Sequence, residues 1–217
     1  MTIGQTTVLV IDDHPLFRKG VADLIAMEPA LRLVGEAADG ASGVQLALTL
    51  QPDLILLDLN MKGMNGIAAL ERMRAAEIDA RVIMLTVSDA EEDVVAALRA
   101  GADGYLLKDM EPEDILEGLR RATQGRLAIS ERLAELLAHA LREDPRPKRP
   151  DQAGLTRREE EILALITKGF SNKLIARDLD LTVGTVKVHV KHVLKKLGLR
   201  TRVEAAVWAI SSQGRGG

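Results

Sequence analysis

The sequence contains no cysteine and very few aromatic residues. Of its 217 residues, one is Trp, one is Tyr and two are Phe, so aromatic residues make up 2% of the chain while hydrophobic residues make up 47%. The absence of cysteine excludes a disulfide scaffold and a thiolate metal site. No apolar run approaches the ~20 residues of a membrane span, and the N-terminus lacks the basic and apolar pattern of a secretory signal. The composition predicts a soluble, cytoplasmic protein without membrane contact, packed by Leu, Val, Ile and Ala.

Charge is divided unevenly along the chain. The net charge is −3, but residues 1–142 carry 14 Lys and Arg against 23 Asp and Glu, whereas residues 155–217 carry 12 against six. A basic C-terminal segment beside an acidic N-terminal one suggests a polyanion-binding unit joined to a different module. An ordinary solvated surface is the alternative explanation.

The N-terminal part alternates apolar runs with amphipathic stretches. We expect strands near residues 7–11, 31–37, 53–58, 80–86 and 103–107, and helices over 15–27, 40–49, 65–75, 90–100 and 111–124. Strands that alternate with helices form parallel sheets covered on both faces. The pattern predicts an α/β fold with a five-stranded doubly wound parallel sheet.

The rest of the chain has a different pattern. A further helix is expected over 130–141, followed by a charged stretch with three prolines, 143–151, which has the composition of a linker. After it come candidate helices at 156–168, 172–178, 183–197 and 202–210, the first with Thr156 and Glu159 at capping-box spacing. We therefore predict three regions: 1–125, a linker region 126–154, and a small all-α four-helix unit 155–217.

Acidic side chains and one lysine follow the predicted strands. Asp12 and Asp13 come after the first strand, Asp58 after the third and Lys108 after the fifth. In an open parallel sheet these strand ends meet at one edge, where ligands bind. Carboxylates gathered there repel one another unless a cation is present. We expect Asp12, Asp13, Asp58 and the backbone carbonyl of Asn60 to hold Mg²⁺, with Lys108 neutralising a phosphoryl oxygen.

A carboxylate at this position can accept a phosphoryl group, and we expect Asp58 to do so. Thr86, which ends the fourth strand, is expected to turn toward the added phosphate, and Tyr105 to fill the space that Thr86 leaves. Each residue taken alone has a plainer explanation. An Asp at a strand end is often a helix cap, Thr86 and Tyr105 suit a core, and Lys108 suits a solvated surface.

The stretch 183–197 has two distinct faces when it is drawn as a helix. One stripe is apolar, and the adjacent side carries Lys187, Val188, Lys191 and Lys195. Lysines that meet phosphates or guanine edges, with a valine for a thymine methyl, suit entry into the major groove of DNA. Thr182 and Thr185 near the start of the helix are candidate phosphate donors. A merely solvated lysine face is the alternative.

Residues 1–125 resemble the receiver domain of two-component response regulators. The matching pieces are Asp12-Asp13-His14, Asp58 within Leu-Leu-Asp-Leu-Asn-Met, Thr86-Val-Ser, and Gly101-Ala-Asp-Gly-Tyr-Leu-Leu-Lys108. The resemblance implies that Asp58 accepts phosphate from a sensor histidine kinase and that Thr86 and Tyr105 couple this event to the output surface. Lys62 departs from the family pattern, which usually has proline there, so the loop after Asp58 is expected to be looser.

Residues 155–210 resemble the LuxR-type helix-turn-helix output domain. The match lies in Leu155-Thr-Arg-Arg-Glu-Glu-Glu-Ile-Leu, Gly169-Phe-Ser-Asn-Lys-Leu-Ile-Ala, and Thr185-Val-Lys-Val-His-Val-Lys-His. The resemblance implies DNA as a partner, base reading by Lys187, Val188 and Lys191, and a homodimer on DNA through Val203, Val207 and Trp208. RNA polymerase is a further candidate partner. Likeness to the nitrate- and nitrite-responsive members is the sole basis for expecting that signal.

These expectations combine into a phosphorylation-gated, sequence-specific transcription regulator in which the unphosphorylated receiver masks the DNA-reading helix. An enzyme that uses Asp58 as nucleophile, a phosphotransferase or phosphatase, is one alternative, but Asn60 stands where such hydrolases place a second acid. A dinucleotide-binding module is disfavoured because no Gly-x-Gly-x-x-Gly follows the first strand. A DNA-binding regulator that is independent of phosphorylation is the remaining alternative.

Overall fold

A computed structural model of the chain describes residues 5–124 and 153–213. The chain folds into two compact units, Met1–Thr123 and Gln124–Gly217, and each is described by itself. The expected helix at 130–141 and the linker at 143–151 lie outside the described residues, and the predicted region boundaries remain predictions. Within the described ranges, no helix is both long enough and apolar enough to cross a membrane.

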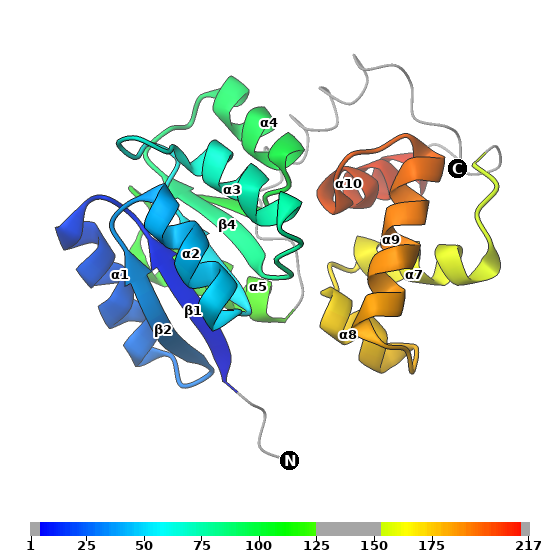
Figure 1. The fold of residues 1–217 in the computed structure, drawn as a ribbon, viewed down its shortest axis with the longest axis horizontal. Helices are drawn as coiled ribbons and strands as arrows, with labels where there is room; N and C mark the ends of the chain where they lie inside the picture. The colour runs from blue at the N-terminus through cyan, green and yellow to red at the C-terminus, as the bar shows by residue number, and fades with distance from the viewer. Residues whose placement is uncertain (1–4, 125–152, 214–217) are drawn as a thin grey trace. The chain divides into compact units, whose positions relative to one another are not determined.

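The N-terminal unit is a five-stranded parallel sheet with helices between the strands (Figure 1). Its strands are β1 (Thr6–Ile11), β2 (Leu31–Ala37), β3 (Leu54–Leu57), β4 (Arg81–Thr86) and β5 (Gly104–Leu107). Its helices are α1 (Pro15–Met27), α2 (Gly40–Leu50), α3 (Gly66–Ala75), α4 (Glu91–Ala100) and α5 (Pro112–Thr123). The predicted α/β class and the alternation of elements are confirmed.

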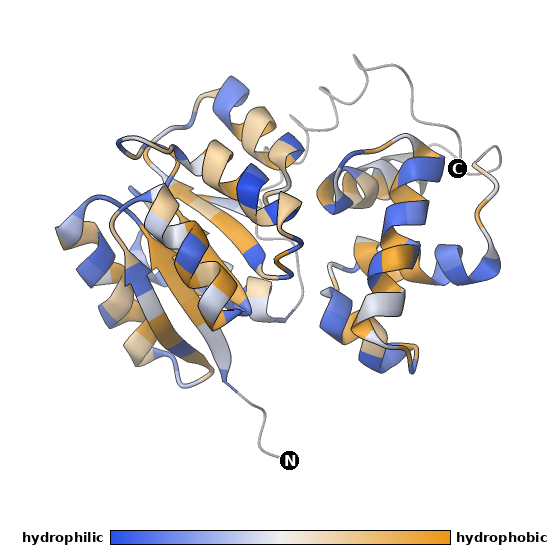
Figure 2. Ribbon diagram, in the orientation of Figure 1, coloured by the Kyte–Doolittle hydropathy of each residue, from blue (hydrophilic) through white to orange (hydrophobic). Residues whose placement is uncertain are grey.

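The central strands β3 and β4 are largely apolar because both faces of the sheet are covered, and Arg81 and Thr86 at the two ends of β4 are the polar exceptions. All residues of β3 and β4 are buried, and Figure 2 shows the sheet mostly in the hydrophobic colour while the surrounding helices carry both colours. On the helical layers, α2 packs against α3 and α3 against α4, whereas α1 packs against α5. This pattern groups the five helices into two layers around a sheet built from continuous hydrophobic runs.

The strand order β2-β1-β3-β4-β5 brings β1 and β3 side by side at the centre of the sheet. Their last residues, Ile11 and Leu57, are paired, and the Asp58 amide donates to the Ile11 carbonyl at 2.9 Å. The chain continues from β1 to β2 on one side of the sheet and then returns to β3, β4 and β5 on the other side. Sheets of this kind bind ligands where the strand order reverses, which here is at the carboxyl ends of β1 and β3.

The C-terminal unit contains four described helices, as predicted: α7 (Arg157–Thr167), α8 (Asn172–Asp178), α9 (Val183–Leu197) and α10 (Arg202–Gln213). The predicted capping box is present, because the Thr156 hydroxyl accepts from the Glu159 amide and the Glu159 carboxylate accepts from the Thr156 amide. Helix α9 packs on α7, α8 and α10, and its side chains with no exposed area are Val186, Val193 and Leu197. The apolar stripe of α9 therefore faces the core of this unit.

Candidate functional site

The three aspartates predicted to act together meet at the carboxyl edge of the sheet. Asp12 and Asp58 are each 2% exposed, and Asp13 is partly buried. Ligand atoms of these residues, together with one from His14, all lie within 4.8 Å of one another. We call this group of four residues the acidic pocket. Residues far apart in the sequence are brought together because β1 and β3 are neighbours in the sheet.

Lys108 reaches the acidic pocket from a more distant strand. It follows β5, which is separated from β3 by β4, and its long side chain places Nζ 2.8 Å from Asp12 Oδ2 and 2.9 Å from Asp58 Oδ2. The same ammonium lies 4.8 Å from the centre of the Phe17 ring, a favourable cation–π distance. The side chain is largely buried, so its charge acts in a poorly solvated environment. The predicted convergence of Lys108 on this edge is present in the structure.

The carboxylates of the acidic pocket carry more negative charge than the Lys108 ammonium balances. Burial raises the pKa of the Asp58 carboxyl above its ordinary value, although the Lys108 ammonium acts in the opposite direction. Three carboxylates and one ammonium leave an excess of negative charge when all are ionised. Beyond its ion pair with Lys108, Asp58 Oδ2 is buried with no hydrogen-bond donor among the described residues. Oxygen ligands with such an excess of negative charge suit a hard divalent cation. The residues present therefore fit Mg²⁺.

The loop after Asp58 stays close to the acidic pocket. The Asn60 amide lies 3.4 Å from Asp58 Oδ1, and the Lys62 amide donates to Asp13 Oδ2 at 3.3 Å. Proline, the residue usual in the family at this position, has no N–H to make the second contact. At Gly66 a Cβ would come within 2.2 Å of the Asp58 carbonyl oxygen. The loop therefore passes so close to the backbone of Asp58 that only glycine fits.

Thr86 and Tyr105, the predicted coupling residues, are linked through Ser88. The Thr86 hydroxyl is buried and accepts from the Ser88 amide at 3.3 Å, while the Tyr105 hydroxyl donates to the Ser88 carbonyl at 2.8 Å. Burial raises the pKa of Tyr105 to about 12. Tyr105 is already packed inside, with 2% of its area exposed. The two side chains thus hold the same backbone segment.

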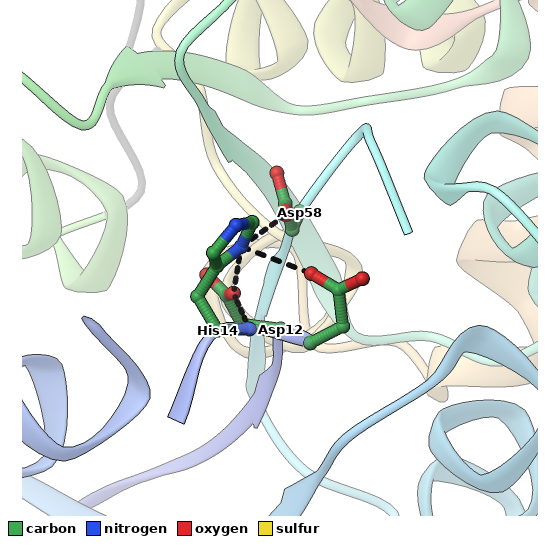
Figure 3. A group of neighbouring side chains, drawn as sticks. Asp12, His14 and Asp58 are labelled. Atoms are coloured by element: carbon green, nitrogen blue, oxygen red, sulfur yellow. Dashed lines mark hydrogen bonds and ion pairs between the residues drawn. The ribbon is translucent and has the colours of Figure 1, made fainter. Parts of the chain in front are cut away.

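The structure adds His14 to the site, a residue to which the sequence assigned no chemical role. Its Nδ1 lies 2.9 Å from Asp13 Oδ1, 3.4 Å from Asp12 Oδ1 and 3.9 Å from Asp58 Oδ2. Figure 3 shows the imidazole turned toward the carboxylates of Asp12 and Asp58. The available signal was its place directly after two acids and before Pro15, which begins α1.

The predicted DNA-contacting residues lie on α9 and at its N-cap, and most of them are exposed. Val188 is 53% exposed, although it is apolar, and Lys191 and Lys195 beside it are exposed. Lys187 is half-buried. Thr182 caps the helix by accepting from the Thr185 amide, and the two hydroxyls lie 2.9 Å apart. The neighbouring Lys196 belongs to the unit's internal contacts instead, because its ammonium donates to Glu159 and to the Gly154 carbonyl.

The residues predicted to form a dimer surface need correction. Val203, Val207 and Trp208 are 1%, 4% and 8% exposed, because α10 packs against α7 and α9. Their apolar character reflects the core of the C-terminal unit, so these side chains are not available on its surface. On the same helix Ile210 is 54% exposed.

Both units match known families. Residues 8–120 match the response regulator receiver domain, and residues 153–209 match the luxR family of bacterial regulatory proteins. The chain belongs to the response regulators that join a receiver domain to a LuxR-type DNA-binding domain. It is a transcription regulator of a two-component system.

Similar proteins cover almost the whole chain. The nitrate/nitrite response regulator protein NarL of Escherichia coli K12 is 55% identical over 202 residues, which are 93% of this chain and 94% of that protein. The nitrate/nitrite response regulator protein NarP of the same organism is 45% identical over 95% of both chains. The crystal structure of the response regulator ChrA, from a heme-sensing two-component system, matches with a TM-score of 0.52 and 32% identity, over 97% of this chain and 98% of that one.

Proposed function

We propose that Asp58 receives a phosphoryl group from the phosphohistidine of a sensor kinase. A carboxylate oxygen of Asp58 attacks phosphorus, the phosphorus–nitrogen bond breaks, and the released imidazole takes up a proton. The position of Asp58 supports this role, because its carboxylate lies at the carboxyl edge of the sheet with Lys108 2.9 Å away to pair with phosphoryl oxygens. This position of Asp58 beside a buried lysine is the observation that carries the proposal.

Asp12, Asp13 and Asp58 would hold Mg²⁺, and the Asn60 carbonyl is a further proposed ligand. When bound, the ion neutralises charge on the phosphoryl oxygens and on the carboxylates. The protein's own contribution is to orient the acids. The His14 amide donates to Asp12 Oδ1 at 2.8 Å and the Lys62 amide holds Asp13. These contacts fix two of the carboxylates before any ion arrives.

Thr86 and Tyr105 would transmit the modification. A phosphoryl oxygen that draws the Thr86 hydroxyl toward it breaks the contact with the Ser88 amide. The Ser88 peptide, which Tyr105 holds through its carbonyl, then changes position, and the start of α4 changes with it, because the Ser88 hydroxyl donates to Asp93. The coupling thus runs through contacts between named groups.

The output is binding of DNA by α9. We assign base reading to Lys187, Val188 and Lys191, and phosphate contacts to Lys195, Thr182 and Thr185. An exposed apolar residue among exposed lysines supports this assignment. A homodimer on DNA is proposed as the active form, RNA polymerase as a further partner, and the cytoplasm, where the DNA of a bacterial regulator lies, as the compartment.

Nitrate or nitrite is the proposed upstream signal. Two relatives named as nitrate/nitrite response regulators are 55% and 45% identical to this chain over nearly its whole length. The expected result is that the level of transcripts dependent on this chain changes, up or down, when nitrate is added to cells, and an unchanged transcript level would contradict the assignment.

The central test is DNA retardation with and without a small phosphodonor and Mg²⁺. Wild type is expected to gain operator affinity on treatment, and Asp58→Asn to gain none, because the amide cannot accept phosphate. Asp23→Asn, which changes an exposed acid on α1, is the matched control and should respond like wild type. Equal operator affinity of wild type and Asp58→Asn after treatment with the phosphodonor would instead favour a regulator that works without phosphorylation.

A further inference from the structure

We propose that His14 is a metal ligand, so that the acidic pocket prefers a later first-row divalent ion such as Ni²⁺ over Mg²⁺. The inference rests on the proposed function of the pocket and adds its ion preference. It concerns one residue of this chain, the imidazole that lies against all three carboxylates.

The distances fit an octahedral ligand set. Neighbouring ligands around an ion with bonds of about 2.1 Å lie ~3.0 Å apart, and opposite ligands lie ~4.2 Å apart. The separations from His14 Nδ1 to Asp13, Asp12 and Asp58 oxygens are 2.9, 3.4 and 3.9 Å, close to or within this range. Three carboxylates and one imidazole still leave octahedral positions for water or phosphoryl oxygens. The set is therefore compatible with the phosphoryl transfer proposed above.

The backbone fixes His14 in this place. It is the residue before α1, its amide donates to Asp12 Oδ1 at 2.8 Å, and Pro15 follows it at the first helical position. The side chain is 67% exposed, so packing in a core does not explain why it turns toward the acids. Asp58 Oδ2, in contrast, is buried, and its neighbours among the ion pairs of the described residues are the Lys108 ammonium and the His14 imidazole. That atom faces the imidazole across 3.9 Å, with room for a shared ion.

Ligand chemistry then determines the preferred ion. Oxygen ligands alone suit Mg²⁺, whereas an imidazole nitrogen is bound more strongly by the later first-row metals, and affinity rises from Mn²⁺ to Ni²⁺. Replacing one water of an all-oxygen site by a neutral imidazole should therefore raise the affinity for Ni²⁺ far more than that for Mg²⁺. The nitrogen of His14 therefore gives the pocket a stronger preference for Ni²⁺ than the three aspartates give by themselves.

The experiment is calorimetric titration of the full chain with Ni²⁺ alone and, separately, with Mg²⁺ alone. His14→Ala is expected to lower Ni²⁺ affinity at least about tenfold, the range known for losing even an indirect partner of a metal ligand, and to change Mg²⁺ affinity less than about twofold. His14→Asn, which offers an oxygen, should keep Mg²⁺ binding and still lose the Ni²⁺ preference. His192→Ala, at an exposed histidine of α9, is the control for nickel bound elsewhere and should retain the tight site.

The outcomes separate this inference from the proposed function. If Mg²⁺ binds and depends on Asp58 but His14→Ala leaves the Ni²⁺ affinity unchanged, the inference is overturned and the pocket's proposed role stands. Equal losses for both ions in His14→Ala also overturn it, since they indicate a structural role. If neither ion binds in a manner that Asp58→Asn abolishes, both the ion site of the proposed function and the role of His14 fail.

Discussion

In the N-terminal unit the charges that define the site are buried, and in the C-terminal unit they are exposed. Asp12, Asp58 and Lys108 are buried, and the Lys108 ammonium contacts both carboxylates directly. Lys191 and Lys195 lie on an open helix face. Buried charges interact strongly and depend on their partners, whereas exposed charges are screened by water and salt. Buried charges therefore suit the phosphoryl transfer proposed for the N-terminal unit, and exposed charges suit the DNA binding proposed for the C-terminal unit.

Removing the buried lysine should give the largest effect. Lys108→Ala leaves the Asp12 and Asp58 carboxylates without their ammonium, and breaking a buried pair in this way costs about 3–5 kcal/mol. Urea unfolding followed by circular dichroism measures the loss, and Mg²⁺ should restore part of it because a cation again balances the acids. Lys19→Ala, at an exposed position of α1, should leave the midpoint in place. A Lys108→Ala protein as stable as wild type would contradict the buried-charge description of the pocket.

The close approach at Gly66 should give the next largest effect. A Cβ there would lie 2.2 Å from the Asp58 carbonyl oxygen and 2.9 Å from Leu59 Cα. Gly66→Ala therefore forces the backbone beside Asp58 to move, which should lower the free energy of unfolding by about 1–3 kcal/mol. Gly20→Ala is the matched control, because a Cβ at Gly20 meets nothing within 4 Å and it lies within α1. The free energy of unfolding of Gly20→Ala should rise by about 0.5–1 kcal/mol. Equal thermal midpoints for the two variants would contradict the steric account.

Glu159, one of the buried acids of the C-terminal unit, tests whether the stability of this unit also depends on charge. Burial alone would raise the pKa of Glu159, but bonds from Lys196 and Thr156 outweigh it, and the pKa lies below the ordinary value of 4.5. Glu159→Gln should lower the free energy of unfolding by about 1–2 kcal/mol at neutral pH, because charge-assisted hydrogen bonds are lost. A carboxyl whose folded pKa is lowered stabilises the protein above its ordinary pKa, and this contribution is lost as pH falls through the lowered value.

Trp208, the only tryptophan, reports this unfolding by fluorescence. The difference in the free energy of unfolding between wild type and Glu159→Gln should therefore become smaller in acid, below pH 4.5. Glu160→Gln, at the exposed neighbouring position, should show no difference at either pH. If Glu159→Gln lowers the free energy of unfolding by the same amount at every pH, the charge of Glu159 is not the cause of the loss.

An exposed lysine should change binding and leave stability unaltered. Lys191→Ala is expected to weaken operator affinity by about 1–3 kcal/mol if it reads a base, or to reduce the salt slope by about 1 if it contacts a phosphate. The unfolding midpoint should stay the same, since surface charges contribute little to stability. Affinity measured at several salt concentrations distinguishes the two roles, and Lys168→Ala, an exposed lysine after α7, is the control. Equal binding by both variants would move the DNA interface to another face.

The smallest effect concerns the residue that departs from the family pattern. Lys62→Pro removes the amide that donates to Asp13 Oδ2 at 3.3 Å, and one such bond is worth about 0.5–1.5 kcal/mol. Mg²⁺ affinity should fall by no more than that amount. Lys62→Ala retains the amide and loses only the side chain, so it should bind Mg²⁺ as wild type does. A loss in Lys62→Ala that equals the loss in Lys62→Pro would assign the effect to the side-chain charge.

Much of the fold could be predicted because local patterns and tertiary packing agree. Pro15 at the start of α1 and the Thr156–Glu159 capping box mark helix starts by local chemistry. The convergence of Asp12, Asp58 and Lys108 could also be predicted, since parallel strand ends share an edge. The dimer residues could not, because a valine or tryptophan on an amphipathic helix has the same pattern whether it faces its own core or a partner.

The sequence by itself determined the elements, their order, the edge at which the acids gather and the lysine face of α9, because all of these follow from local periodicity and the rules of parallel sheets. Only the tertiary structure decided that Val203, Val207 and Trp208 are interior, that Ser88 joins Thr86 to Tyr105, and that the His14 imidazole faces the acids. These are distances between side chains, set by how packed elements direct their side chains, and periodicity along a chain contains no such information.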